Sequence, residues 1–132
     1  MLTVRLTISH LMTSLLTAAC ATVPQASVED RTLPFGCDDI VVVGRVENVA
    51  YEHVKSEDDL LGHGWVTARL KVQRVVKGAG VPPFLPVRYF AHTYMRQDRD
   101  FMLVLKRISP EGYEIRTGQL TSVRPRLASR CD

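Results

Sequence analysis

Apolar residues stand at every second position along much of this chain, which is the spacing of a strand that buries one face. The pattern is clearest in one segment of alternating apolar and polar residues: Val66, Thr67, Ala68, Arg69, Leu70, Lys71 and Val72. One face of this strand should therefore belong to the core, and the other face should be basic and exposed to solvent. No segment has a helical period of any length, so an all-β fold is expected.

A longer strand is expected to precede it, starting with the unbroken apolar run at residues 40–43 and reaching Tyr51. The step of three residues from Val46 to Val49 interrupts the two-residue period, so a bulge is predicted near residues 47–48. The segment between the two strands, residues 55–64, is polar and is predicted to be a loop.

Three further strands are predicted in the second half of the chain, at residues 87–91, 101–108 and 113–120. Gly and Pro residues at positions 78–86 predict an irregular connection before the first of these strands. Pro110 and Gly112 stand where a type I turn accepts them, so the last two strands should form a hairpin. Five strands in about 85 residues suit a small closed or nearly closed barrel.

The first 19 residues have the three-part layout of a cleavable secretory signal. Arg5 precedes an apolar stretch, and small residues end this stretch just before Cys20. The apolar stretch is too short to span a bilayer as a permanent helix. Residues 16–20 (LTAAC) partly match a bacterial lipobox, with Thr17 in the place usually held by Leu, and the match predicts acylation of Cys20.

Ala21 follows Cys20 in place of the Asp associated with retention in the inner membrane, which predicts a lipoprotein of the outer membrane. The alternative is ordinary cleavage after Ala21, which would release a soluble periplasmic or secreted protein. Residues 20–36 are polar and rich in Pro, Ser and Thr. They are predicted to tether the anchor to a single domain at residues 37–132.

Three cysteines in an exported protein leave one without a partner unless one of them has another fate. Acylation of Cys20 would leave Cys37 and Cys131, which are predicted to form a disulfide in an oxidising compartment. This bridge would tie the start of the first strand to the C-terminal tail. Closing so long a loop would contribute about 4 kcal/mol in the chain-entropy model.

Three segments together resemble bacterial domains similar to the tissue inhibitors of metalloproteinases: residues 40–46 (IVVVGRV), 68–78 (ARLKVQRVVKG) and 101–105 (FMLVL). The resemblance covers residues 37–131 and implies a netrin-like domain on a five-stranded OB-type barrel. The resemblance bears chiefly on the fold, and binding of another macromolecule, as an inhibitor or an accessory factor, is the expected function. In the animal inhibitors a free N-terminal Cys chelates the zinc of the protease. Cys37 lies inside this chain and Cys20 would be acylated, so no residue here is expected to act in that way.

Composition places the chain among soluble globular proteins, with 45% hydrophobic and 23% charged residues. The formal net charge of +3 is too small to predict nucleic-acid binding, and an exported protein would rarely meet nucleic acid. Residues 21–63 carry three Lys or Arg and nine Asp or Glu, whereas residues 64–132 carry thirteen and five. The expected partners of the basic half are anionic lipids, envelope glycans or an acidic protein surface.

Strand parity predicts a mixed surface of aromatic and basic side chains on the outside of the barrel, if the valine and leucine row is buried. The outward residues of this kind on two neighbouring strands are Trp65, Arg69, Lys71, Arg88, Phe90 and His92. OB-type barrels bind ligands with aromatic faces of this kind, interleaved with cations. The alternative is that the tether or a C-terminal segment covers Trp65 and Phe90.

Residues 92–100 hold the best candidates for catalysis, with His92 as a base oriented by Asp98 or Asp100. No nucleophile stands beside them, and the chain has no hydrolase or metalloprotease motif. The loop at residues 53–63 is predicted to be acidic and solvated, with a weak divalent-cation site as the alternative, and no metal or cofactor is expected. The sequence therefore predicts an exported, lipid-anchored, non-enzymatic binding module of the cell envelope. The alternative function is a small envelope enzyme that uses residues 92–100.

Overall fold

The computed structural model describes residues 31–131 of the chain, and these residues form an all-β protein. Its elements are β1 (Thr32–Phe35), β2 (Ile40–His53), β3 (Gly64–Lys77), β4 (Phe84–Ala91), β5 (Phe101–Arg107), β6 (Tyr113–Leu120), the 3-10 helix η2 (Thr121–Val123) and β7 (Arg126–Ser129). The five strands predicted from the apolar spacing correspond to β2 through β6. Within the described part, no helix is long and apolar enough to cross a membrane. The predicted signal and Cys20 lie outside the described residues.

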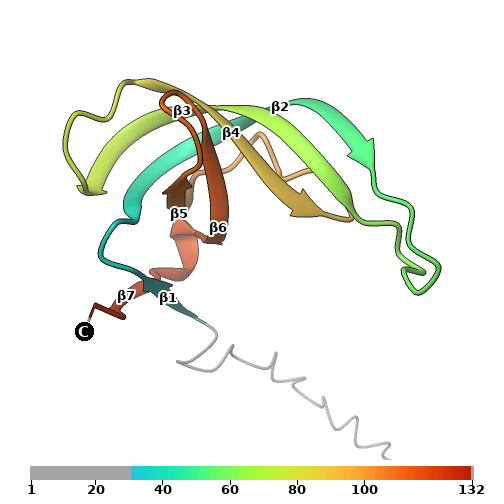
Figure 1. The fold of residues 1–132 in the computed structure, drawn as a ribbon. Helices are drawn as coiled ribbons and strands as arrows, with labels where there is room; N and C mark the ends of the chain where they lie inside the picture. The colour runs from blue at the N-terminus through green and yellow to red at the C-terminus, as the bar shows by residue number, and fades with distance from the viewer. Residues whose placement is uncertain (1–30, 132) are drawn as a thin grey trace, which may run out of the picture.

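Strands β2 through β6 close into a five-stranded barrel with the order β2-β3-β4-β6-β5, in which β5 also pairs with β2 (Figure 1). Neighbouring strands are antiparallel, except that β4 and β6 run parallel. The parallel contact is short, because only Val87 and Arg88 of β4 pair with β6. This closed mixed barrel confirms the predicted all-β, OB-like fold class.

The barrel core is made of the side chains that strand parity turns inward. Its buried residues come from all five strands: Val42, Val46, Val66, Ala68, Leu70, Leu85, Val87, Tyr89, Leu103, Leu105 and Tyr113. Gly44 allows β2 and β3 to approach closely, because a Cβ at this position would lie 2.5 Å from the carbonyl oxygen of Lys71. Burial of the alternating apolar set fixes the register of β3 and β4, so the residues between them face outward.

Strands β2 and β3 are each 14 residues long and reach beyond the barrel. β5 pairs only with residues 40–44 of β2, so β2, β3 and β4 continue as a three-stranded sheet, to the right of the barrel in Figure 1. The bulge in β2 falls at Val49, next to its predicted position, because residues 48–50 of β2 lie opposite residues 67–68 of β3. Val49 is 73% exposed, so the three-residue step carries it out of the core.

A second, two-stranded sheet joins the two ends of the described chain, and it was not predicted from the apolar spacing. β1 and β7 run parallel and pair along their whole length. Leu33 of β1 is buried against Val41 and Val104 of the barrel. Residues 32–35 therefore belong to the folded domain and not to the predicted tether of residues 20–36. A strand of four residues that buries one side chain is too short to show a period.

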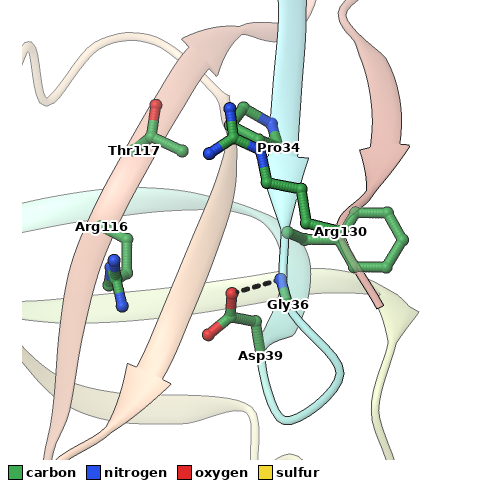
Figure 2. Close-up of a pocket in the computed structure, with 7 residues that line it drawn as sticks. Pro34, Gly36, Asp39, Arg116, Thr117 and Arg130 are labelled. Atoms are coloured by element: carbon green, nitrogen blue, oxygen red, sulfur yellow. Dashed lines mark hydrogen bonds between the residues drawn. The ribbon is translucent and has the colours of Figure 1, made fainter. Parts of the chain in front are cut away.

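A disulfide between Cys37 and Cys131 closes this end of the molecule, as predicted, and joins Cα atoms that are 5.1 Å apart and 94 residues distant in sequence. Beside it, the backbone N–H of Gly36 donates to a carboxylate oxygen of Asp39 at 2.6 Å (Figure 2). The backbone N–H of Arg130 donates to the carbonyl oxygen of Phe35 at 2.8 Å. The disulfide indicates an oxidising compartment outside the cytoplasm.

Candidate outer-face binding site

The outer face of β3 and β4 carries the aromatic and basic residues singled out from the sequence. Cross-strand pairing places Trp65 opposite Phe90 and Thr67 opposite Arg88. Because buried residues alternate with these four on both strands, their side chains point away from the core. This is the direction predicted from the valine and leucine row.

Five side chains at this face touch one another in order, and we call them the aromatic row: Arg88, Trp65, Phe90, His63 and His92. The guanidinium carbon of Arg88 lies 4.4 Å from the centre of the Trp65 ring. The ring centres of Trp65 and Phe90 are 5.2 Å apart, with their planes inclined at 60°. Phe90 stacks on His63 at 5.6 Å, and His63 meets His92 edge-on at 5.4 Å. The row therefore consists of four rings in continuous contact, with the guanidinium of Arg88 at one end.

Phe90, at the centre of the row, is 51% exposed, and Trp65 is partly buried. The C-terminal strand β7 pairs with β1 in the separate small sheet. Within residues 31–131, the alternative in which a C-terminal segment covers both rings therefore does not hold. The part of the predicted tether that precedes Arg31 lies outside the described residues.

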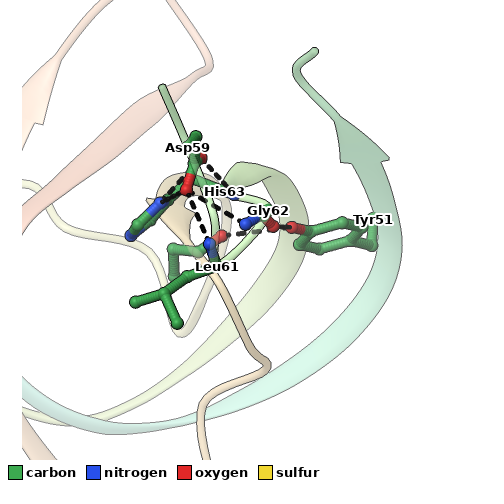
Figure 3. A network of polar contacts seen from close by, with 6 residues as sticks. Tyr51, Asp59, Leu61, Gly62 and His63 are labelled. Carbon is green, nitrogen blue, oxygen red and sulfur yellow. Dashed lines mark hydrogen bonds and ion pairs between the residues drawn. The ribbon is translucent and has the colours of Figure 1, made fainter. Parts of the chain in front are cut away.

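The loop between β2 and β3 holds His63 in place through Asp59. The Asp59 carboxylate accepts hydrogen bonds from the backbone N–H groups of Leu61, Gly62 and His63, and it lies 2.9 Å from Nδ1 of His63 (Figure 3). The Tyr51 hydroxyl donates to the carbonyl oxygen of Gly62 at 2.5 Å. The hydrogen bonds from the backbone and ring of His63 lower the pKa of Asp59 to about 2. The loop is therefore a folded turn that presents His63 to the aromatic row.

The sequence left two alternatives for this loop, an acidic solvated loop and a weak divalent-cation site. Among residues 31–131, no group of three or more His, Cys, Asp or Glu side chains is arranged to hold a metal ion.

The sequence placed His63 in an acidic loop, and its ring contact with Phe90 was missed. The pairing of Gly64 with Ala91 puts the end of this loop beside the end of β4. Extending the strand register by one residue pair would have pointed to His63.

Arg69 and Lys71 lie farther along the same face, beside Phe84. Lys71 pairs with Phe84 across the two strands, and the Arg69 guanidinium carbon lies 5.4 Å from the centre of the Phe84 ring. Phe84 is 48% exposed, so it adds to the aromatic surface of this face. It is missing from the predicted patch because β4 starts at Phe84, inside the segment predicted to be an irregular connection.

Acidic residues neutralise both arginines of this face. Arg88 forms an ion pair with Glu114 of β6 at 2.9 Å, and Arg69 forms one with Glu47 of β2 at 2.6 Å. Lys71 forms no ion pair with residues 31–131. The contrast between an acidic and a basic half of the sequence is partly cancelled here, because the acidic strand β2 lies beside the basic strand β3. The face is therefore more aromatic than basic.

The side chains considered for catalysis do not come together. His92 lies at the end of the aromatic row. Asp98 pairs with Arg96 at 2.7 Å, and the hydrogen bond from Arg96 lowers the pKa of Asp98. Asp100 pairs with Arg45 at 2.8 Å; burial alone would raise the pKa of Asp100, but its hydrogen bonds outweigh burial and lower it. Both carboxylates are thus bound to arginines, and neither orients His92.

No protein-family model, curated protein or solved structure matches this chain. The resemblance to netrin-like domains therefore receives no support from known proteins. The functional inference depends on the barrel, the disulfide and the surfaces of the described residues.

Proposed function

We propose that the protein is an exported, lipid-anchored, non-enzymatic binding module of the cell envelope, and that its aromatic row binds a partner protein. The half-exposed Phe90, in contact with Trp65 on one side and His63 on the other, is the observation that carries the proposal. Aromatic and arginine side chains are the commonest anchors of protein interfaces. OB-type barrels also bind ligands on the face of their second and third strands, which here are β3 and β4.

The pairing of the two arginines favours a protein partner over an anionic polymer. A phosphate or sulfate group would have to displace Glu114 from Arg88 or Glu47 from Arg69. Burial of exposed aromatic surface needs no such exchange. An anionic glycan or lipid is the alternative ligand, and it would bind chiefly through Lys71.

The proposed location combines the disulfide with the N-terminal sequence. The bridge between Cys37 and Cys131 indicates an oxidising compartment. The lipobox-like residues before Cys20 favour an acylated protein, and Ala21 favours the outer membrane. A soluble periplasmic or secreted protein is the alternative.

A pull-down from an envelope extract tests the proposed function. The bait is the mature chain, and Phe90→Ala is compared with Phe84→Ala, a matched change at a Phe of similar exposure on the same face. We expect Phe90→Ala to weaken association by about 1–3 kcal/mol, whereas Phe84→Ala should retain the partner. A partner that binds wild type and Phe90→Ala equally well would contradict the proposal. Capture of a polysaccharide that is lost in Lys71→Gln would favour the anionic alternative.

The competing function is an enzyme that uses residues 92–100. A screen of the mature chain against hydrolase substrates, with His92→Ala as the comparison, separates it from binding. Turnover by the wild type that His92→Ala abolishes would replace the binding proposal. The ion pairs of Asp98 and Asp100 give no support to this second function.

A further inference from the structure

A hollow lined by both charged and apolar residues lies between the barrel and the small β1–β7 sheet, and it is built from other elements than the aromatic row. It has a volume of about 300 Å³. The residues that line it are Pro34, Phe35, Gly36, Asp39, Arg116, Thr117 and Arg130 (Figure 2). We call it the junction pocket.

The backbone around the junction pocket is fixed by three separate constraints. β1 pairs with β7 up to Phe35, and the next N–H of the C-terminal segment, that of Arg130, donates to the Phe35 carbonyl. The turn after β1 is closed by the hydrogen bond from Gly36 to Asp39. The disulfide then joins Cys37 to Cys131, the residues that directly follow Gly36 and Arg130. The turn and Arg130 are therefore held together by backbone bonds and one covalent bond.

The charged residues that line the junction pocket carry a net charge of one positive unit. Arg116 comes from β6 and Arg130 follows β7, and among residues 31–131 neither side chain has an ion pair or hydrogen bond. Asp39 supplies one negative charge, and one of its oxygens is occupied by the Gly36 N–H. Two guanidinium groups and one carboxylate match an oxyanion with a single charge better than a doubly charged one. The second oxygen of Asp39 is a hydrogen-bond acceptor for a hydroxyl group.

We propose that the junction pocket binds a singly charged oxyanion that carries a hydroxyl group nearby. Arg116 and Arg130 bind the oxyanion, and Asp39 accepts the hydroxyl hydrogen bond. A sugar acid and the glycerol phosphodiester head group of a lipid share this chemistry. The site is independent of the aromatic row, so loss of either one leaves the other intact.

The test uses the full chain with Cys20→Ser, which removes the predicted anchor while keeping the disulfide. Sodium glucuronate and uncharged glucose are titrated against the labelled protein, and backbone amide shifts are followed by NMR. Vesicles of phosphatidylglycerol and of phosphatidylcholine are then compared by flotation. Arg116→Gln and Arg130→Gln are the pocket variants, and Arg99→Gln is the control with the same loss of charge outside the pocket.

We expect one of two responses. Glucuronate shifts the amides of Gly36, Asp39 and Thr117 while glucose does not, or phosphatidylglycerol vesicles bind the protein while phosphatidylcholine vesicles do not. Each pocket variant should weaken that binding by roughly tenfold or more, with Arg99→Gln unchanged. A response to glucuronate identifies a soluble ligand, and a response to vesicles alone identifies a lipid head group; both support the site. Equal responses to charged and uncharged probes, no response to any probe, or full binding by both pocket variants would overturn it. Partner capture through Phe90 is unaffected by any of these outcomes.

Discussion

Trp65 is held on the outer surface by two contacts, with Arg88 and with its cross-strand neighbour Phe90. Arg88 lies over one side of its ring, and Phe90 lies beside it. A cation–π contact and an aromatic pair together contribute about 1–2.5 kcal/mol. The inward-facing residues of β3, such as Val66 and Leu70, are buried in the barrel core and do not depend on the Trp65 ring for their burial. Trp65 therefore orders the surface without being part of the barrel core.

We expect Trp65→Ala to leave the domain folded and to lower its stability by about 1–2.5 kcal/mol, through loss of these two contacts. Thermal unfolding followed by circular dichroism measures the change, and titration with the captured partner measures the loss of binding. Phe84→Ala, which removes an exposed ring from the other end of the face, is the control. A Trp65→Ala protein without a cooperative unfolding transition would show that the ring belongs to the core.

The lowered pKa of Asp59 predicts that the β2–β3 loop keeps its hydrogen bonds to a lower pH than an ordinary Asp would allow. The folded value of about 2 lies below the ordinary 3.8, because the backbone and ring of His63 donate hydrogen bonds to the carboxylate. A lowered carboxyl pKa stabilises the folded state above the ordinary pKa, and this stabilisation is lost as the pH falls from about 4 to about 2. An NMR titration of the Asp59 carboxyl carbon should therefore have its midpoint near 2. The backbone amide of His63 should shift over the same pH range, and Asp59→Asn should remove this shift. A midpoint near 3.8 for the Asp59 carboxyl of the wild type would mean that the turn is open.

Individual residues differed in how far the sequence could place them. The parity of one strand was enough to turn Trp65 and Arg69 outward, because a slip by one residue would bury charged side chains. His63 and Phe84 were not foreseen, because each lies at the edge of a strand where the apolar alternation ends. The positions of His63 and Phe84 on the outer face depend on the register between β3 and β4, and this register cannot be read from the residues of one strand alone.

Among the elements, the small β1–β7 sheet depends most on the disulfide. It has two strands of four residues, and its buried side chain Leu33 contacts the barrel. The long barrel strands β2 and β3 pair over almost their whole length without help from the bridge. Loss of the bridge should therefore loosen the small sheet before the barrel.

We expect Cys37→Ser combined with Cys131→Ser to destabilise the protein by about 2–4 kcal/mol, since the unfolded chain regains the freedom that a 94-residue separation removes. Chemical denaturation measures the free energy of unfolding, and hydrogen exchange locates the effect. The amides of β1 and β7 should exchange faster, whereas those of the β2–β3 hairpin should keep their protection. Uniform acceleration in both sheets would show that the bridge supports the barrel itself.

The five barrel strands were predictable because each buries enough alternating residues to show a period. β1 and β7 were not predictable, since they pair only after the two ends of the domain meet, and Pro34 interrupts the first of them. The start of β4 was hidden in the same way by Pro82, Pro83 and Pro86. Pro82 and Pro83 precede β4, whereas Pro34 and Pro86 lie within strands that have a partner on one side only at these positions. A sheet tolerates proline at such an edge.

At the scale of the whole molecule, closure of the barrel brings the acidic and basic halves of the sequence together. Arg69 with Glu47, and Arg45 with Asp100, are ion pairs that join the half at residues 21–63 to the half at residues 64–132. Strands from the acidic and basic halves lie side by side in the barrel, so the uneven charge of the sequence does not give the molecule one acidic side and one basic side. Two arginines without an ion pair among residues 31–131, Arg116 and Arg130, line the junction pocket near the start of the described chain.

The anchor at Cys20 is the remaining whole-molecule prediction, and it would set where the two proposed binding surfaces work. Eleven residues separate Cys20 from the start of β1, and a fully extended chain of this length reaches about 40 Å. An acylated protein would thus keep its domain within this distance of the membrane surface. Detergent phase partitioning should recover the wild type in the detergent phase and Cys20→Ser in the aqueous phase, with a matching difference in mature mass. If both proteins stay in the aqueous phase at the same mature mass apart from the substitution, the anchor does not exist and the domain is released.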